Sequence, residues 1–246
     1  MDTYQVTPNL VPTVDRFRAL ARSSPWRWTT LEFEWTHKNQ SELSHAWVRR
    51  PGAYRVELAD GTVTSEVQLD PRETMLTTAR AGQQQTGLWP HQVQPHLDGD
   101  GLVSDYPQDL PVDYDAPFYA NYHWVAMLTP FELADGSDWV NDEAPVRLTA
   151  LTEVHHYGRL AWEAIAVPTE SYEPRCDCCA LLSGSLNSET RQWRPDVPSK
   201  IRLDVQTGMC VYVEHHRQPT SVDLEVRILA VDAVLDDDLF TIPGGR

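Results

Sequence analysis

The chain has 246 residues, and its length and 41% hydrophobic content suit one large domain, residues 1–246, better than two ordinary domains. Its formal net charge of −16 argues against non-specific attraction to nucleic acid or to anionic membranes. No window approaches the roughly 18 consecutive apolar residues that a membrane span needs, and no basic, apolar leader opens the sequence. We therefore expect a cytoplasmic protein with no nucleic-acid partner and no membrane span.

The first predicted element is a helix, and most of the others are strands. Apolar residues at helical spacing predict a helix over residues 10–22, with Thr13 as its N-cap and Pro25 beyond its end. Apolar residues that alternate with polar ones predict half-buried strands. The predicted strands cover residues 26–37, 44–58, 63–69, 146–157, 160–167, 201–208, 209–215 and 222–231. A change of row in the first indicates a bulge or a strand with both faces partly covered, and the second contains a hairpin turn.

A loop-rich stretch at residues 79–145 interrupts the strands. Gly, Pro, Asp and Gln punctuate it, and only residues 119–131 suggest a short helix. Long irregular segments in a compact domain commonly carry function or cover a cavity. The predicted fold class is therefore α+β and mostly β: one strongly curved antiparallel sheet, an N-terminal helix, and residues 79–145 as a lid.

These elements resemble the superfamily of the bacterial lipoprotein carrier LolA, which includes the RseB-type sensor domain. The resemblance rests on Trp47 to Glu57, Leu203 to Gly208 and Leu239 to Pro243, whose order and spacing agree with that superfamily. It implies a half-barrel sheet whose concave side is closed by helices over an apolar cavity, with a lipid or another apolar small molecule as partner. Members are typically exported, whereas this chain looks like a leaderless bacterial relative.

The sharpest local motif is a cysteine cluster. Cys176, Cys178 and Cys179 place three thiols within four residues, and soft thiolates are ligands for zinc or cuprous copper. The spacing is not the paired C-x2-C of a zinc ribbon, so an inert buried loop, a disulfide and a redox role stay open beside metal binding. Cys210, His156 and His215 are the candidates to complete a shell, the last two because they continue inward-facing rows of their strands.

Aromatic and aliphatic residues on the predicted strands are the candidates to line a cavity. The proposed walls are Trp28, Phe33, Trp47, Tyr54, Val211 and Leu224, which alternatively fill an ordinary core. The sequence has no G-x-S-x-G elbow, no phosphate-binding loop and no H-E-x-x-H motif, so no catalytic residues are assigned.

Three functions follow from these observations. The first is a non-enzymatic binding protein that holds an apolar ligand between the sheet and its lid. The second is a metal-binding or thiol-based sensor centred on Cys176–Cys179, with zinc or copper as candidate ions. The third is a protein-interaction module with a protein partner.

Overall fold

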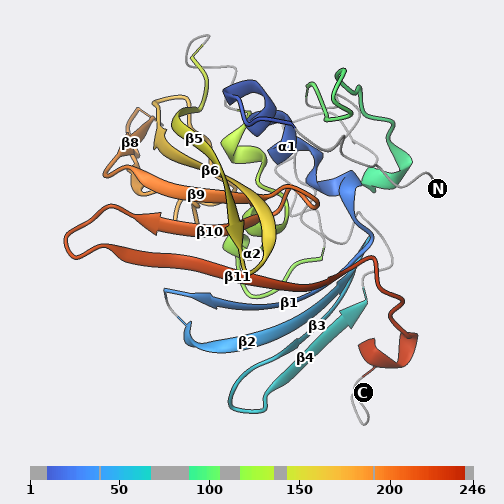
Figure 1. Ribbon diagram of the computed structural model, residues 1–246. Helices are drawn as coiled ribbons and strands as arrows, with labels where there is room; N and C mark the ends of the chain where they lie inside the picture. Colours follow the sequence, from blue (N-terminus) through green and yellow to red (C-terminus); the bar gives the residue numbers. More distant parts are fainter. Residues whose placement is uncertain are drawn as a thin grey trace, which may run out of the picture.

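The computed structural model describes residues 10–38, 40–67, 89–105, 117–135, 143–190 and 192–241. Its principal feature is a sheet of nine antiparallel strands that curves around the helices (Figure 1). The strand order is β4-β3-β2-β1-β11-β10-β9-β6-β5. The strands are β1 (Thr30–His37), β2 (Gln40–Arg49), β3 (Ala53–Glu57), β4 (Val63–Val67), β5 (Val146–His156), β6 (Arg159–Pro168), β9 (Ser199–Asp204), β10 (Cys210–His215) and β11 (Ser221–Val231).

The helices are α1 (Val14–Arg27) and the short α2 (Tyr122–Leu128), together with the 3-10 turns η2 (Pro90–Gln92), η3 (Phe131–Leu133) and η4 (Asp237–Phe240). A small separate sheet pairs β7 (Gly184–Leu186) with β8 (Trp193–Pro195). Residues from α1, α2 and the inward rows of the strands form one large apolar cluster. The prediction of a mostly β, α+β fold with one curved antiparallel sheet and an N-terminal helix is confirmed.

The predicted N-cap of α1 is confirmed, because the Thr13 hydroxyl accepts a hydrogen bond from Arg16 N at 3.2 Å, so that the helix begins at Val14 rather than at residue 10. Its predicted end was wrong: Pro25 lies inside the helix, which continues to Arg27. A proline there removes one helical hydrogen bond near the terminus, and the last turn is buried against the rest of the protein. Trp26 and Trp28, assigned to the first strand from the sequence, therefore lie at the end of this helix.

The strand predictions hold more closely. The change of row expected in the first strand comes instead from the end of α1 at Arg27, before β1 begins at Thr30. The register of β1 with β11 does shift between Glu32 and Phe33, but the extra residue, Leu229, lies on β11. The turn that joins β9 to β10 contains Gly208 at φ +72°, a left-handed conformation that favours glycine. Of the predicted lid, residues 89–105, 117–135 and 143–145 are described and the remainder lies outside the described residues. No helix in the described part of the chain is long and apolar enough to cross a membrane.

Candidate functional site

A second β-bulge places a carboxylate inside the protein. Strand β11 pairs with β10 so that Val213 faces Leu224 and Glu214 faces Val222, which leaves Asp223 as the extra residue between them. A bulge redirects the side chain of its extra residue. The Asp223 side chain is accordingly only 2% exposed, although alternation with its apolar neighbours would place it on the solvent side. Lys38 reaches one oxygen of this carboxylate, with Nζ 3.2 Å from Oδ1.

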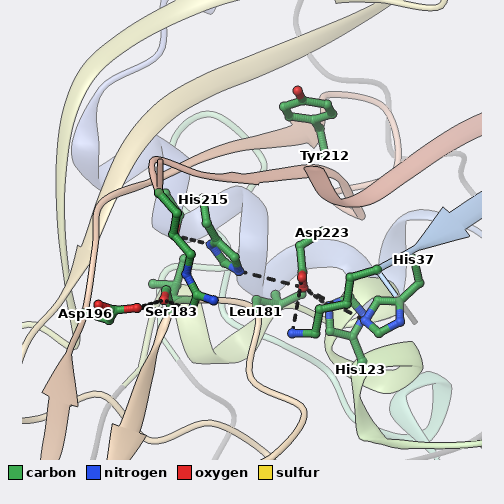
Figure 2. A network of polar contacts seen from close by, with 12 residues as sticks. His37, His123, Leu181, Ser183, Asp196, Tyr212, His215 and Asp223 are labelled. Carbon is green, nitrogen blue, oxygen red and sulfur yellow. Dashed lines mark hydrogen bonds and ion pairs between the residues drawn. The ribbon is translucent and has the colours of Figure 1, made fainter. Parts of the chain in front are cut away.

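Three imidazoles converge on the other oxygen of Asp223 (Figure 2). The distances from Nε2 to Oδ2 are 3.9 Å for His37, 3.6 Å for His123 and 3.7 Å for His215. His37 ends β1, His215 ends β10, and His123 lies in the first turn of α2, so three separate elements supply the rings. We call His37, His123, His215 and Asp223 the histidine centre.

Neighbouring groups hold the rings of the histidine centre in place. The Nδ1 atom of His215 lies 2.8 Å from the hydroxyl oxygen of Ser199, which fixes the ring while Nε2 points at Asp223. Asn121 caps α2 by accepting a hydrogen bond from the backbone N–H of His123 at 2.9 Å. The rings of His37 and His123 are in contact and tilted by 54° to one another, with centroids 4.2 Å apart. Partners of this kind orient imidazoles that bind metal ions.

The centre contains polar atoms that the protein itself leaves unsatisfied. Among the described residues, Nε2 of His37, Nε2 of His123 and Oδ2 of Asp223 are buried and have no hydrogen-bond partner. A buried polar atom without a partner costs about 1–3 kcal/mol. His37, His123 and Asp223 each have one potential ligand atom within 4.8 Å of those of the other two.

Charge and burial act in opposite directions at this centre. Burial alone would raise the pKa of Asp223, but His123, His215 and Lys38 outweigh it and hold that pKa below its ordinary value. Burial and the neighbouring His123 lower the pKa of His37 to about 4. The folded protein therefore favours an ionised Asp223 beside a neutral His37, the protonation states in which these two groups act as metal ligands.

A small pocket of about 40 Å³ adjoins the histidine centre. It is lined by His37, His123 and several aromatic and apolar side chains, among them Trp35, Tyr119 and Met127. A buried water occupies roughly 10–15 Å³ by the same measure, so this volume holds about three waters.

The residues predicted to line a cavity are largely brought together, but within the packed core. Trp28, Phe33, Tyr54, Val211 and Leu224 are all nearly inaccessible and belong to the main apolar cluster. Trp47 is not with them. It pairs with Glu32 on the opposite row of the sheet and stacks on His45, with ring centroids 3.9 Å apart.

The six predicted metal ligands occupy four different places. Cys176, Cys178 and Cys179 lie together on a surface loop, and His215 belongs to the histidine centre. Cys210 is buried in the core, where burial raises the pKa of its thiol to about 12. His156 is hydrogen-bonded through Nε2 to the Val226 carbonyl at 2.8 Å. The structure thus does not assemble the single shell that these residues were predicted to form.

Sequence reasoning missed three members of the histidine centre. His37 had a usable signal, because it continues the inward row of Phe33 and Trp35 along β1. Asp223 had the opposite signal, since its row faces solvent until the bulge redirects it. His123 had none, because only the packing of α2 against the sheet brings it near.

Comparison with known proteins adds structural neighbours but no family. No protein-family model matches the chain, and no curated protein matches it. The crystal structure of MucB is similar with a TM-score of 0.43 and 13% identity, covering 94% of this chain and 62% of that chain. MucB in complex with MucA(peri) is similar with a TM-score of 0.40 and 12% identity, covering 94% of this chain and 60% of that chain. The Pseudomonas aeruginosa MucA/MucB complex gives 0.38 and 14%, with coverage of 92% and 60%. This chain spans about three fifths of the length of each neighbour.

Proposed function

We propose that this chain is a non-enzymatic metal-binding protein whose histidine centre holds one divalent transition-metal ion, with zinc preferred. The observation that carries the proposal is the convergence of His37, His123 and Asp223 through buried atoms that have no hydrogen-bond partner among the described residues. An ion bonded to these atoms removes their desolvation cost. His215 lies 3.7 Å from the same carboxylate oxygen and supplies the fourth ligand once its ring moves toward the other three groups.

The donor set fits zinc in number and chemistry. Three imidazole nitrogens and one carboxylate oxygen are zinc ligands, with bonds of about 2.0–2.2 Å. Tetrahedral ligands at that length lie about 3.4 Å apart, whereas the nitrogens here lie 3.6 to 3.9 Å from Oδ2. Each of these three distances has to shorten by a few tenths of an ångström. His215 also has to approach the other rings, because it lies outside the group of ligand atoms that are all within 4.8 Å of one another. Lys38 binds Oδ1 and leaves Oδ2 for the ion, the arrangement expected of an outer partner.

The ligand count favours a structural or sensing role over catalysis. Catalytic zinc usually has three protein ligands and an open position for water, whereas structural zinc is closed by four protein ligands. The histidine centre offers three donors within 4.8 Å of one another and His215 beside them as the fourth. The adjoining pocket admits only about three waters.

The apolar-ligand function receives less support from the described residues. Five of its six proposed wall residues pack within the main core, and Trp47 lies on the opposite row. Much of the predicted lid lies outside the described residues. Binding of an apolar ligand therefore stays a prediction, as does binding of a protein partner.

The proposal is tested by zinc titration of protein prepared without a metal-affinity tag and stripped with a chelator. Cys176, Cys178 and Cys179 are changed to Ser in this background, so that thiols do not contribute. We expect one zinc per chain, measured by isothermal titration calorimetry against a competing chelator.

His215→Asn and His216→Asn form a matched pair for this titration. The two residues are adjacent, but His215 is 4% exposed at the centre whereas His216 is 37% exposed and lies near Glu214. Loss of a direct ligand should weaken zinc binding by more than about 100-fold, since changes to outer partners alone cost about 10–100-fold. His216→Asn should leave the affinity unchanged. Equal affinities in both variants, or no bound zinc in the parent, would overturn the proposal.

A further inference from the structure

The three loop cysteines form a compact thiol cluster on the surface. The Sγ atoms of Cys176 and Cys178 are 3.0 Å apart, and those of Cys178 and Cys179 are 3.4 Å apart. A turn closed by the hydrogen bond from Cys179 N to Cys176 O, at 3.0 Å, gathers them. Cys178 is exposed and the other two are half-buried, so the cluster is accessible from solvent.

A buried carboxylate holds the base of this loop. Glu132 accepts hydrogen bonds from the backbone N–H of Leu181 at 2.8 Å and of Arg175 at 3.4 Å, and these residues flank the cysteines on either side. The Tyr172 hydroxyl donates a further hydrogen bond to Glu132. Because both ends of the loop are hydrogen-bonded to one side chain, the positions from which the cysteines start and end are fixed.

We infer that Cys176, Cys178 and Cys179 bind a soft monovalent metal ion, cuprous copper, at a second site independent of the histidine centre. Thiolates select soft ions such as Cu(I) over harder divalent ones. Each thiol that becomes a ligand releases one proton to solvent, and copper enters as Cu(I), so no oxidant or reductant is consumed in binding.

The ligand count distinguishes Cu(I) from zinc at this loop. Structural zinc takes four protein ligands, but among the described residues no His, Asp, Glu or further Cys joins the three thiols within ligand reach. Three soft donors without a fourth suit an ion that accepts low coordination. Three sulfur ligands in a plane around one ion, with bonds of about 2.3 Å, lie about 4 Å apart. The thiols, now 3.0 and 3.4 Å apart, therefore have to separate by about 0.6–1 Å to admit the ion.

The test is anaerobic titration of the reduced full-length chain with Cu(I) buffered by a bicinchoninate-type competitor. One Cu(I) per chain is expected. Cys178→Ser should weaken binding by more than about 100-fold, more than the 10–100-fold cost typical of an outer-shell change. Cys210→Ala removes a fully buried thiol that is not part of the loop, although it lies near Glu132 and Tyr172 at the loop base. It is the control for loss of a cysteine that is not a ligand and should retain full affinity.

Asp223→Asn separates this proposal from the one for the histidine centre. That variant should lose zinc and keep Cu(I), whereas Cys178→Ser should do the reverse. Cu(I) binding that survives Cys178→Ser but is lost in Asp223→Asn would overturn the assignment. So would absence of Cu(I) binding in reduced protein whose three thiols react with a thiol reagent, since the ligands would then be present and unused.

Discussion

Asp223→Asn in the metal-free protein tests whether the buried carboxylate is a net stabilising group. The substitution keeps the side-chain shape but removes the negative charge that faces Lys38 and three imidazoles. These partners lower the pKa of Asp223 despite its burial. The folded state therefore favours the ionised over the protonated side chain more strongly than the unfolded state does, and ionisation of Asp223 stabilises the fold. The variant should therefore be less stable at pH 7, even in the presence of a chelator.

The expected loss follows from the contacts of that carboxylate. Loss of a hydrogen bond to a charged group at a buried site costs about 1–3 kcal/mol, which for a chain of this size lowers Tm by about 2–12 °C. The stability that depends on an ionised Asp223 is present above the unfolded-state pKa of about 3.9 and is lost as pH falls below it. The difference between parent and variant should therefore shrink in acid.

Urea unfolding followed by tryptophan fluorescence, with chelator present, measures this difference. Asp196→Asn is the control, because Asp196 forms a half-exposed ion pair with Arg217 at 3.1 Å and should cost less than about 1 kcal/mol. A metal-free Asp223→Asn protein as stable as the parent at pH 7, or more stable, would refute the reasoning. In that case the free-energy cost of burying the charge would exceed the stabilisation that its neighbouring cationic and imidazole groups provide.

Three further predictions concern single positions. Gly208→Ala should lower the free energy of unfolding in urea by about 1–3 kcal/mol more than Gly158→Ala does. Both glycines have positive φ, but of the two only Gly208 would place an added Cβ against a helix carbonyl, at 2.6 Å. Equal losses in the two variants would contradict this. Tyr172→Phe should lower the free energy of unfolding by about 1–3 kcal/mol, because Glu132 loses a buried donor; an unchanged value would show that this contact contributes nothing. Because the pKa of His37 is lowered to about 4 in the folded protein, the metal-free protein should lose stability as pH falls from about 6.5 to 4. His37→Asn should flatten that part of the pH-stability profile. An unaltered profile would assign the loss to other groups.

The sheet was predictable from the sequence because its pattern is local. Alternation along residues 209–215 and 222–231 identifies the strands, and Gly208 marks the turn before them. The helix end was not predictable from Pro25 alone, since packing around the last turn of α1 tolerates a proline there. Local rules thus located most elements but not every boundary.

The histidine centre depends on interactions that sequence patterns do not encode. The bulge at Asp223 reverses the direction that strand alternation assigns to it, and a shift of one residue in register is invisible in composition. His123 lies 86 positions from His37 and 92 from His215, so only the docking of α2 brings the three together. The cysteine cluster, by contrast, was recognisable because its ligands are neighbours in sequence.

The most direct test of the central claim is the zinc K-edge X-ray absorption spectrum of the full-length, reduced chain loaded with one equivalent of zinc. Binding at the histidine centre predicts a first shell of nitrogen and oxygen at about 2.0–2.1 Å with imidazole outer scattering and no sulfur. A first shell dominated by sulfur at about 2.3 Å would contradict it and place the ion at the cysteine loop.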